Sequence, residues 1–266
     1  MASVSSPDME TIEVTRHEGV VTVTLNRPAK KNAATQQMWD ELLETFRDIS
    51  QRADDRVVVV TGAGGEFCSG ADLWQAPSDG PPRHQLAAMR HITEVALALH
   101  RLPQPTIAKV RGVAVGAGCN LAFGCDLVAA GETARFSEIF SKRGLSLDFG
   151  GSWVLPRRVG LHVAKELAFF GDIISAAEAQ SYGLVNRVLP DGELDAFVDA
   201  WAARLVASPP IALAQSKRLL NNSMNVTMEQ ALDDEGAAQT VNFGTRDTPE
   251  AIVAFMEKRE PKFQGR

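Results

Sequence analysis

Hydrophobic and polar residues alternate with a period of two near the start of the chain. Residues 11–28, TIEVTRHEGVVTVTLNRP, predict two strands joined by a hairpin turn around His17, Glu18 and Gly19. In the next segment the apolar residues recur with helical spacing. They predict a helix that buries one face, with Met38, Trp39, Leu42, Leu43, Phe46 and Ile49 on that face.

Buried strands and helices then alternate along the chain. RVVVVTGAGG (56–65) predicts a buried strand that ends in a glycine-rich loop, and residues 83–101 have a helical pattern. PTIAKVRGVAV (105–115) predicts another strand, followed by a glycine-rich turn, a short helix and the strand DLVAAG (126–131). Such alternation predicts an α/β core with helical crossover connections.

Beyond about Gly160 the pattern becomes almost wholly helical. Ser175 with Glu178, and Thr227 with Gln230, have the spacing of capping boxes, which mark helix starts. The helical end is expected to pack on the core or on neighbouring subunits. A wholly separate second domain is the less favoured arrangement.

Composition and charge narrow the possible functions. The 266 residues are 45% hydrophobic and 23% charged, values of an ordinary globular protein. The net charge of −6 argues against a general binder of nucleic acid or anionic membranes. The N-terminus lacks a signal-peptide pattern, and no apolar run is long enough to span a bilayer. Cys68, Cys119 and Cys125 have no metal-ligand or redox spacing, so we expect reduced thiols, no metal site and a cytoplasmic location.

Two glycine-rich turns, in TGAGGEFCSGADL (61–73) and GVAVGAGCNLAFG (112–124), each follow a strand. A dinucleotide fingerprint would need glycine where Phe67 stands, and neither turn continues into the Gly-Lys-Ser/Thr of a phosphate-binding loop. Each turn exposes a peptide N–H, and two such donors on one oxygen would form an oxyanion hole. A helix starting near Gly118 would add its positive end. Either turn taken alone is better explained as a tight turn that needs glycine for steric reasons.

The segments LNRPAKKNA, FCSGADL, GVAVGAGCNLAFGCDLVAAGETARF and GDIISAAEAQSYGLVNRV occur in order, and the chain closes with FMEKREPKFQGR. In these segments the chain resembles the enoyl-CoA hydratase/isomerase (crotonase) superfamily over essentially its whole length. The resemblance implies an α/β fold: a crotonase-like spiral of ββα units forming an acyl-CoA-binding core over 1–200, and a C-terminal helical trimerisation region over 201–266. It also implies an acyl-CoA substrate, no separate cofactor and a homotrimer or a hexamer built as a dimer of trimers.

The resemblance further implies a set of site residues. The backbone N–H groups of Ala71 and Ala117 would hold the thioester oxygen. Substrate-binding positions would be Ala29, Lys30, Ala33, Ser69, Gly70, Asp72, Leu73, Gly118, Asn120, Phe140, Phe255 and Lys258. Lys30 is a candidate phosphate partner, while Phe255 and Lys258 would approach the adenine end, from a neighbouring subunit if the assembly requires it.

The chain departs from the hydratases at their two glutamates, whose positions hold Asn120 and Phe140. Glu138 is nearby, but we expect it to be a solvated glutamate at a strand end or in a loop. Asp148 stands where dienoyl-CoA isomerases and proteins similar to ring-epoxyphenylacetyl-CoA isomerase carry an aspartate. From the residues alone, an Asp before Gly-Gly and a helix is an N-cap; the resemblance favours a catalytic carboxylate instead. Apolar neighbours, Phe140, Leu145, Leu147 and Phe149, would raise its pKa.

One carboxylate is enough for a 1,3-proton shift, so the sequence favours an enoyl-CoA double-bond isomerase. The alternatives are an enoyl-CoA hydratase that uses Glu138 or Asp148, and a non-catalytic crotonase-like binding protein. Residues 74–85 are expected to form a loop over the acyl pocket, where they would determine which acyl group is accepted.

Overall fold

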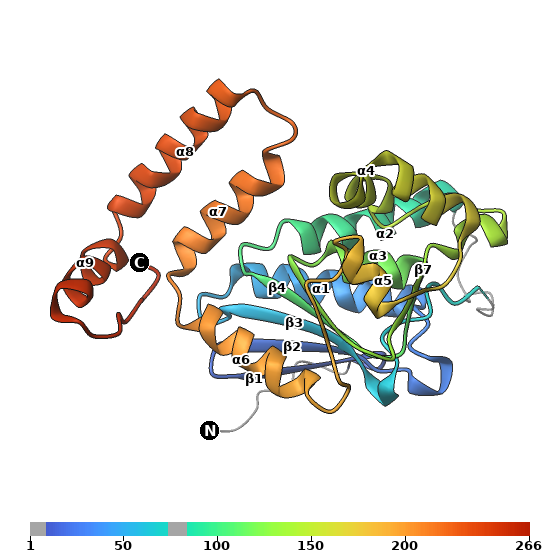
Figure 1. Ribbon diagram of the computed structural model, residues 1–266. Helices are drawn as coiled ribbons and strands as arrows, with labels where there is room; N and C mark the ends of the chain where they lie inside the picture. Colours follow the sequence, from blue (N-terminus) through green and yellow to red (C-terminus); the bar gives the residue numbers. More distant parts are fainter. Residues whose placement is uncertain (1–8, 74–83) are drawn as a thin grey trace.

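The computed structural model describes residues 9–73 and 84–266 (Figure 1). Most of the loop expected at 74–85 therefore lies outside the described residues. The main sheet has the strand order β1-β2-β3-β4-β6-β9, with β1 Ile12–His17, β2 Val20–Leu25, β3 Val57–Gly62, β4 Thr106–Val110, β6 Leu127–Gly131 and β9 Arg187–Leu189. β1 and β2 form the expected antiparallel hairpin, and the other neighbouring strands are parallel.

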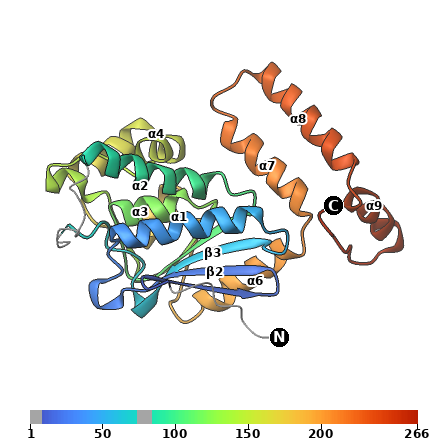
Figure 2. The same cartoon turned by 180° about the vertical axis from the view of Figure 1, so that it is seen from behind.

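The valines of β3 show how this sheet is covered on both faces. Val58 and Val60 belong to the core beneath α1 (Gln36–Gln51), while Val57 and Val59 pack with α6 (Leu194–Val206) on the opposite face. Successive side chains of a strand point to opposite faces, so an unbroken apolar run needs cover on both sides. All six apolar residues predicted for α1 are buried. α2 (Gln85–His100) and α3 (Ala117–Gly124) lie on the same side as α1 (Figure 2).

A second, three-stranded sheet lies beside the first and consists of β5 (Val113–Val115), β7 (Arg135–Ser137) and β8 (Ile174–Ser175). The single strand expected at 105–115 is therefore wrong. It breaks at Gly112, where φ is +56, so that β4 and β5 enter different sheets. The almost wholly helical pattern expected beyond about Gly160 misses β8 and β9. Both are very short and are extended because they pair with strands distant in sequence.

The remaining elements are helical. They are the 3-10 helices η1 (Pro28–Lys30), η2 (Ala63–Gly65) and η3 (Ile139–Arg143), and the α-helices α4 (Gly151–Phe170), α5 (Ala176–Ser181), α7 (Pro210–Asn222), α8 (Met228–Phe243) and α9 (Asp247–Glu257). Both expected capping boxes are present, at the starts of α5 and α8.

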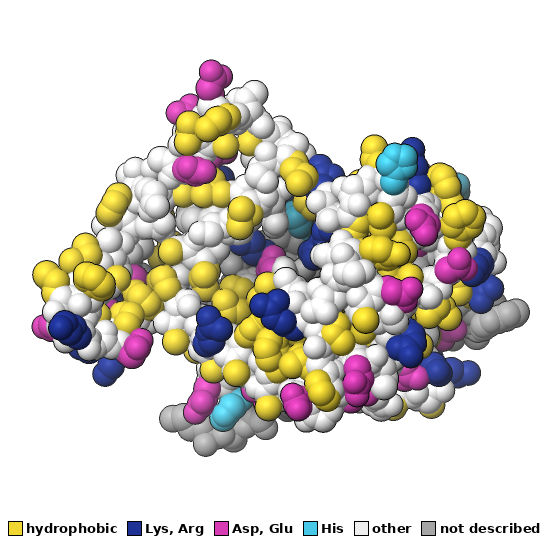
Figure 3. Space-filling model, viewed as in Figure 1, with side chains coloured by type: hydrophobic (Ala, Val, Ile, Leu, Met, Phe, Trp, Pro, Cys, Tyr) yellow, Lys and Arg dark blue, Asp and Glu magenta, His cyan; other side chains and the backbone are white. Residues whose placement is uncertain are grey.

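Helices α7, α8 and α9 project away from the sheet in both views (Figures 1 and 2). Hydrophobic side chains are exposed along this extension (Figure 3), including Met228, Phe243 and Phe255. Helix α6 crosses the boundary expected at residue 200 and packs on the sheet. The division into a core and a trimerisation region stays a prediction. None of the helices in the described part of the chain combines the length and the apolar character needed to cross a membrane.

Candidate active site

The two glycine-rich turns lie against each other. The Cys68 N–H donates to the Val113 carbonyl at 2.9 Å, and the Val115 N–H donates to the Cys68 carbonyl at 2.9 Å. A Cβ added to Gly118 would lie 2.5 Å from the Cys68 carbonyl oxygen, and one added to Gly70 would lie 2.8 Å from the Val115 carbonyl oxygen. Glycine is therefore needed at both positions because one turn packs on the other.

This packing places Ala71 and Ala117 on the wall of one cavity of about 1080 Å³. Within the described part of the chain, neither backbone N–H donates to another residue. Ala117 is also the first residue of α3, whose N-terminal end carries a partial positive charge. The arrangement offers two unused donors for an anionic oxygen.

The same cavity is lined by most of the residues expected from the sequence, namely Lys30, Ala33, Ser69, Gly70, Asp72, Leu73, Phe140 and Asp148. Gly118 is buried against Cys68, and Asn120 is buried behind the wall; neither of them, nor Ala29, is among the lining residues. Phe255 and Lys258 lie in and at the end of α9, at the far end of the helical extension (Figure 1). Their role at a substrate stays a prediction.

Two arginines that the sequence reasoning did not select, Arg27 and Arg143, also line the cavity. Arg27 forms an ion pair with Asp72 at 3.1 Å and also donates to the Ala33 carbonyl, which holds the segment after β2 against the first turn. Arg27 lies inside the quoted segment LNRPAKKNA, so its position in that motif was the available signal. With Lys30, these side chains are the basic residues of a wall that also carries the carboxyls of Glu10, Asp72 and Asp148.

Asp148 lies in the loop between η3 and α4 and does not cap the helix. Gly150 is the N-cap of α4, with φ +84, and no side chain caps that end. The neighbouring Phe149 is left-handed, with φ +47, and its buried ring lies 5.3 Å from the ring of Trp39. This anchor fixes the backbone next to Asp148, whose side chain borders the cavity.

One carboxyl oxygen of Asp148, Oδ1, is buried without a hydrogen-bond partner among the described residues. Burial raises the pKa of this carboxyl from 3.8 to about 6. The direction agrees with the expectation from its apolar neighbours, of which Phe140 and Leu145 share the cavity wall.

Glu138 is 2% exposed, so the expectation of a solvated glutamate is wrong. It follows the last residue of β7, where the chain turns inward toward η3. Asn120 Nδ2 donates to Glu138 Oε2 at 3.2 Å and to the backbone carbonyl of Asp148 at 3.0 Å. Gly151 leaves room for this amide, since a Cβ there would lie 2.5 Å from Asn120 Nδ2. Burial raises the pKa of Glu138 to about 8.

Comparison with known proteins assigns the whole chain to a family. The model for "Enoyl-CoA hydratase/isomerase" matches residues 15–266. The chain belongs to the enoyl-CoA hydratase/isomerase family. It is 36% identical to the 1,2-epoxyphenylacetyl-CoA isomerase of Escherichia coli K12 over 252 residues, covering 94% of this chain and 96% of that protein. It is 35% identical to the 2,3-dehydroadipyl-CoA hydratase of the same strain over 260 residues, covering 97% and 100%.

The crystal structure of an enoyl-CoA hydratase from Bacillus anthracis superimposes with a TM-score of 0.91 at 34% identity, covering 97% of this chain and all of that one. The crotonase-like α/β fold expected from the sequence is thereby confirmed. Similar family members are named both as isomerases and as hydratases, so membership of the family does not indicate which reaction this chain catalyses. That question is therefore addressed from the residues of the site.

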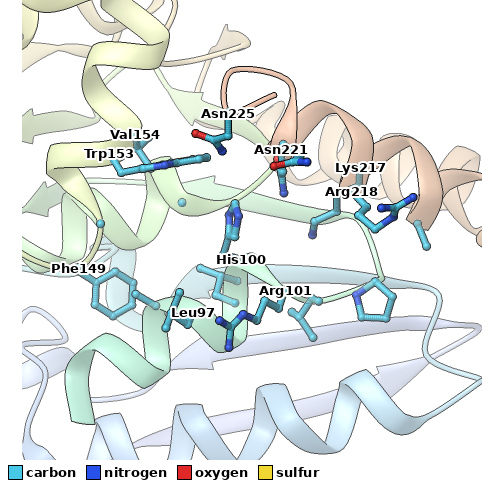
Figure 4. Close-up of a pocket in the computed structure, with 18 of the residues that line it drawn as sticks. Leu97, His100, Arg101, Phe149, Trp153, Val154, Lys217, Arg218, Asn221 and Asn225 are labelled. Carbon is cyan, nitrogen blue, oxygen red and sulfur yellow. The ribbon is translucent and has the colours of Figure 1, made fainter. Parts of the chain in front are cut away.

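A second cavity, of about 890 Å³, lies between the end of α2, the start of α4 and α7 (Figure 4). The ring centroids of His100 and Trp153 lie 5.1 Å apart in a T-shaped arrangement, and Lys217 on α7 forms an ion pair with Asp126 at 2.7 Å. This cavity could not be predicted from the residue pattern, because α2 and α7 are far apart in the chain. Its lining residues include His100 and Lys217 but, among those that the structure describes, no carboxyl side chain.

Proposed function

We propose that this family member is an enoyl-CoA isomerase that moves a double bond along the acyl chain by a 1,3-proton shift. One observation supports this most strongly: a single cavity wall carries two unused backbone N–H donors and the Asp148 carboxyl, with its unpartnered buried oxygen. The substrate in this proposal is an acyl-CoA thioester, so that coenzyme A enters with the substrate and no separate cofactor takes part. A homotrimer or a dimer of trimers remains part of the proposal.

The proposed reaction needs one base and one anion site. The Asp148 carboxylate removes a proton from C2 of a 3-enoyl thioester, and the C–H electron pair becomes a dienolate with its charge on the thioester oxygen. The N–H groups of Ala71 and Ala117 stabilise that charge, each by about 3–4 kcal/mol. Asp148 then returns the proton to C4, which leaves the double bond between C2 and C3. A positioned acid–base group contributes about 10²–10⁴-fold to such a step.

The protonation of the site suits this role at neutral pH. With a pKa of about 6, Asp148 is largely ionised at neutral pH. This pKa is still close enough to neutral pH for the carboxyl to take up and release protons readily. Asp72, which also borders the cavity, is engaged by Arg27.

The alternative is hydration of a 2-enoyl thioester, supported by the similarity to the 2,3-dehydroadipyl-CoA hydratase. Hydration needs water activated at C3 and a proton delivered at C2. In this chain Asn120 and Phe140 occupy the positions of the hydratase glutamates, and neither side chain is a base at neutral pH. Glu138 is a carboxyl, but it does not line the cavity. The site therefore favours isomerisation.

The proposal is tested by following conversion of a 3-enoyl-CoA to its 2-enoyl isomer by wild type and by Asp148→Asn. We expect the variant to lose about 10²–10⁴-fold in kcat while still binding a non-reactive acyl-CoA. Asp54→Asn, the same chemical change at an exposed position, is the matched control and should behave as wild type. An Asp148→Asn protein as active as wild type would refute the mechanism, and a wild type that binds acyl-CoA without converting it would favour a binding protein.

A further inference from the structure

Three buried oxygen atoms without hydrogen-bond partners among the described residues belong to one cluster at the cavity wall and directly behind it. They are Asn120 Oδ1 on α3, Glu138 Oε1 before η3 and Asp148 Oδ1 before α4, and no described residue donates to any of them. The three residues meet at the Asn120 amide, which donates to the Glu138 carboxyl and to the Asp148 backbone. If both carboxyls were ionised, all three oxygens would be acceptors without a donor, which is costly in a buried site.

No cation offsets a second negative charge in this cluster. Within residues 9–73 and 84–266, neither Glu138 nor Asp148 forms an ion pair with a lysine, arginine or histidine. The titratable groups that face Glu138 are the Cys119 thiol from α3 and the Asp148 carboxyl from the loop before α4. Of the basic residues on η3, Lys142 pairs with Asp172 and Arg143 is exposed at the cavity. Charging both carboxyls would place two like charges side by side, one of them fully buried.

A proton on Glu138 removes one of the two charges and supplies a donor for one of the unpartnered oxygens. Glu138 is the group to hold it, since it is 2% exposed and away from the cavity lining, whereas Asp148 borders the cavity and is partly exposed. Resting on the isomerase function proposed above, we propose that Glu138 is a positioning residue that stays a neutral carboxylic acid behind Asp148, so that Asp148 carries the single negative charge of this cluster.

Asn120 connects the two carboxyls physically. One of its two amide hydrogens is used by Glu138 and the other by the Asp148 carbonyl. When Glu138 loses its proton, the new charge repels the Asp148 carboxylate within this small cluster and raises the pKa of Asp148. The base then holds its own proton more tightly. Activity should therefore require an ionised Asp148 together with a protonated Glu138.

The test is the pH dependence of kcat/KM for isomerisation, which reports ionisations of the free enzyme. Wild type should give a bell, rising near the Asp148 pKa of about 6 and falling near the Glu138 pKa of about 8. Glu138→Gln, a neutral mimic of the protonated acid, should keep the rise and lose the fall. The exposed control Glu132→Gln should keep the bell. A Glu138→Gln profile with the same fall as wild type, or a wild type without one, would overturn the proposal.

A second measurement needs no turnover and separates this inference from the proposed function. Infrared difference spectra of protein with isotope-labelled glutamate should show one protonated carboxyl in wild type at neutral pH that Glu138→Gln lacks. In Asp148→Asn the same carboxyl should titrate at lower pH, because the like charge beside it is gone. If all labelled glutamates of wild type are ionised at neutral pH, the inference fails even for an active isomerase. If the band is present in a protein that does not isomerise, only the proposed function fails.

Discussion

Replacing Asp148 by asparagine should make the protein less active and more stable, by an amount that depends on pH. Folding buries this carboxyl and thereby raises its pKa from 3.8 to about 6. The folded state therefore binds this proton more tightly than the unfolded state does. Wild type loses stability as the pH rises from about 4 to about 6, and above that the loss is constant. Asparagine does not titrate, so the variant avoids the loss.

The size of the effect follows from the shift. About two pKa units correspond to about 3 kcal/mol at most above pH 6. Solvent at the cavity side of Asp148 reduces this figure. Between about pH 5 and about pH 8, the advantage of Asp148→Asn over wild type should grow by on the order of 1 kcal/mol.

The assay is urea unfolding of both proteins at about pH 5 and about pH 8, at one protein concentration because assembly changes apparent stability. The account predicts a higher urea midpoint for the variant, with a larger gap at the higher pH, together with loss of isomerisation. That combination also excludes unfolding as the reason for inactivity. A gap that is equal at both pH values would refute the claim that Asp148 is a buried, destabilised carboxylate.

Three further substitutions test other parts of the site. Gly118→Ala should separate the two turns, because the new Cβ would meet the Cys68 carbonyl at 2.5 Å; we expect about 1–3 kcal/mol lower stability by urea unfolding and a lower kcat, and a variant equal to wild type would contradict the packing role. Phe149→Ala should lower stability by about 3–5 kcal/mol in the same assay through loss of the contact with Trp39, and an unchanged urea midpoint would show that this ring is not an anchor. Lys30→Ala should raise KM a few-fold at low salt with little change in kcat, since an exposed charge contributes about 0.2–1 kcal/mol, and a salt-independent KM equal to wild type would argue against a phosphate contact.

Local pattern was enough to predict much of the fold. The hairpin at Glu18 and Gly19 and the buried face of α1 follow from periodicity and turn chemistry, and the structure confirms both. The break at Gly112 and the short strands β8 and β9 could not be predicted in this way. The strands β5, β8 and β9 are extended because they pair with segments far away in the sequence. A run of two or three residues carries no periodicity of its own.

The candidate site shows a similar division. Each turn taken alone was expected to need glycine for steric reasons, and Gly70 and Gly118 do face the opposite turn closely. Ala71 and Ala117, expected from the resemblance to carry the donors, lie on the cavity wall. Glu138 was expected to be solvated because it stands at a strand end, but β7 ends at Ser137 and the chain then turns inward and buries this side chain. A bend that buries one polar side chain depends on tertiary packing, which a single sequence does not display.

The central claim is that this site transfers a proton without adding water. The most direct test incubates purified wild type separately with a 3-enoyl-CoA and with crotonyl-CoA and identifies the products by mass spectrometry. The account predicts rapid formation of the 2-enoyl isomer from the first and little 3-hydroxyacyl-CoA from the second. Rapid hydration of crotonyl-CoA, with no isomerisation of the 3-enoyl-CoA, would contradict it.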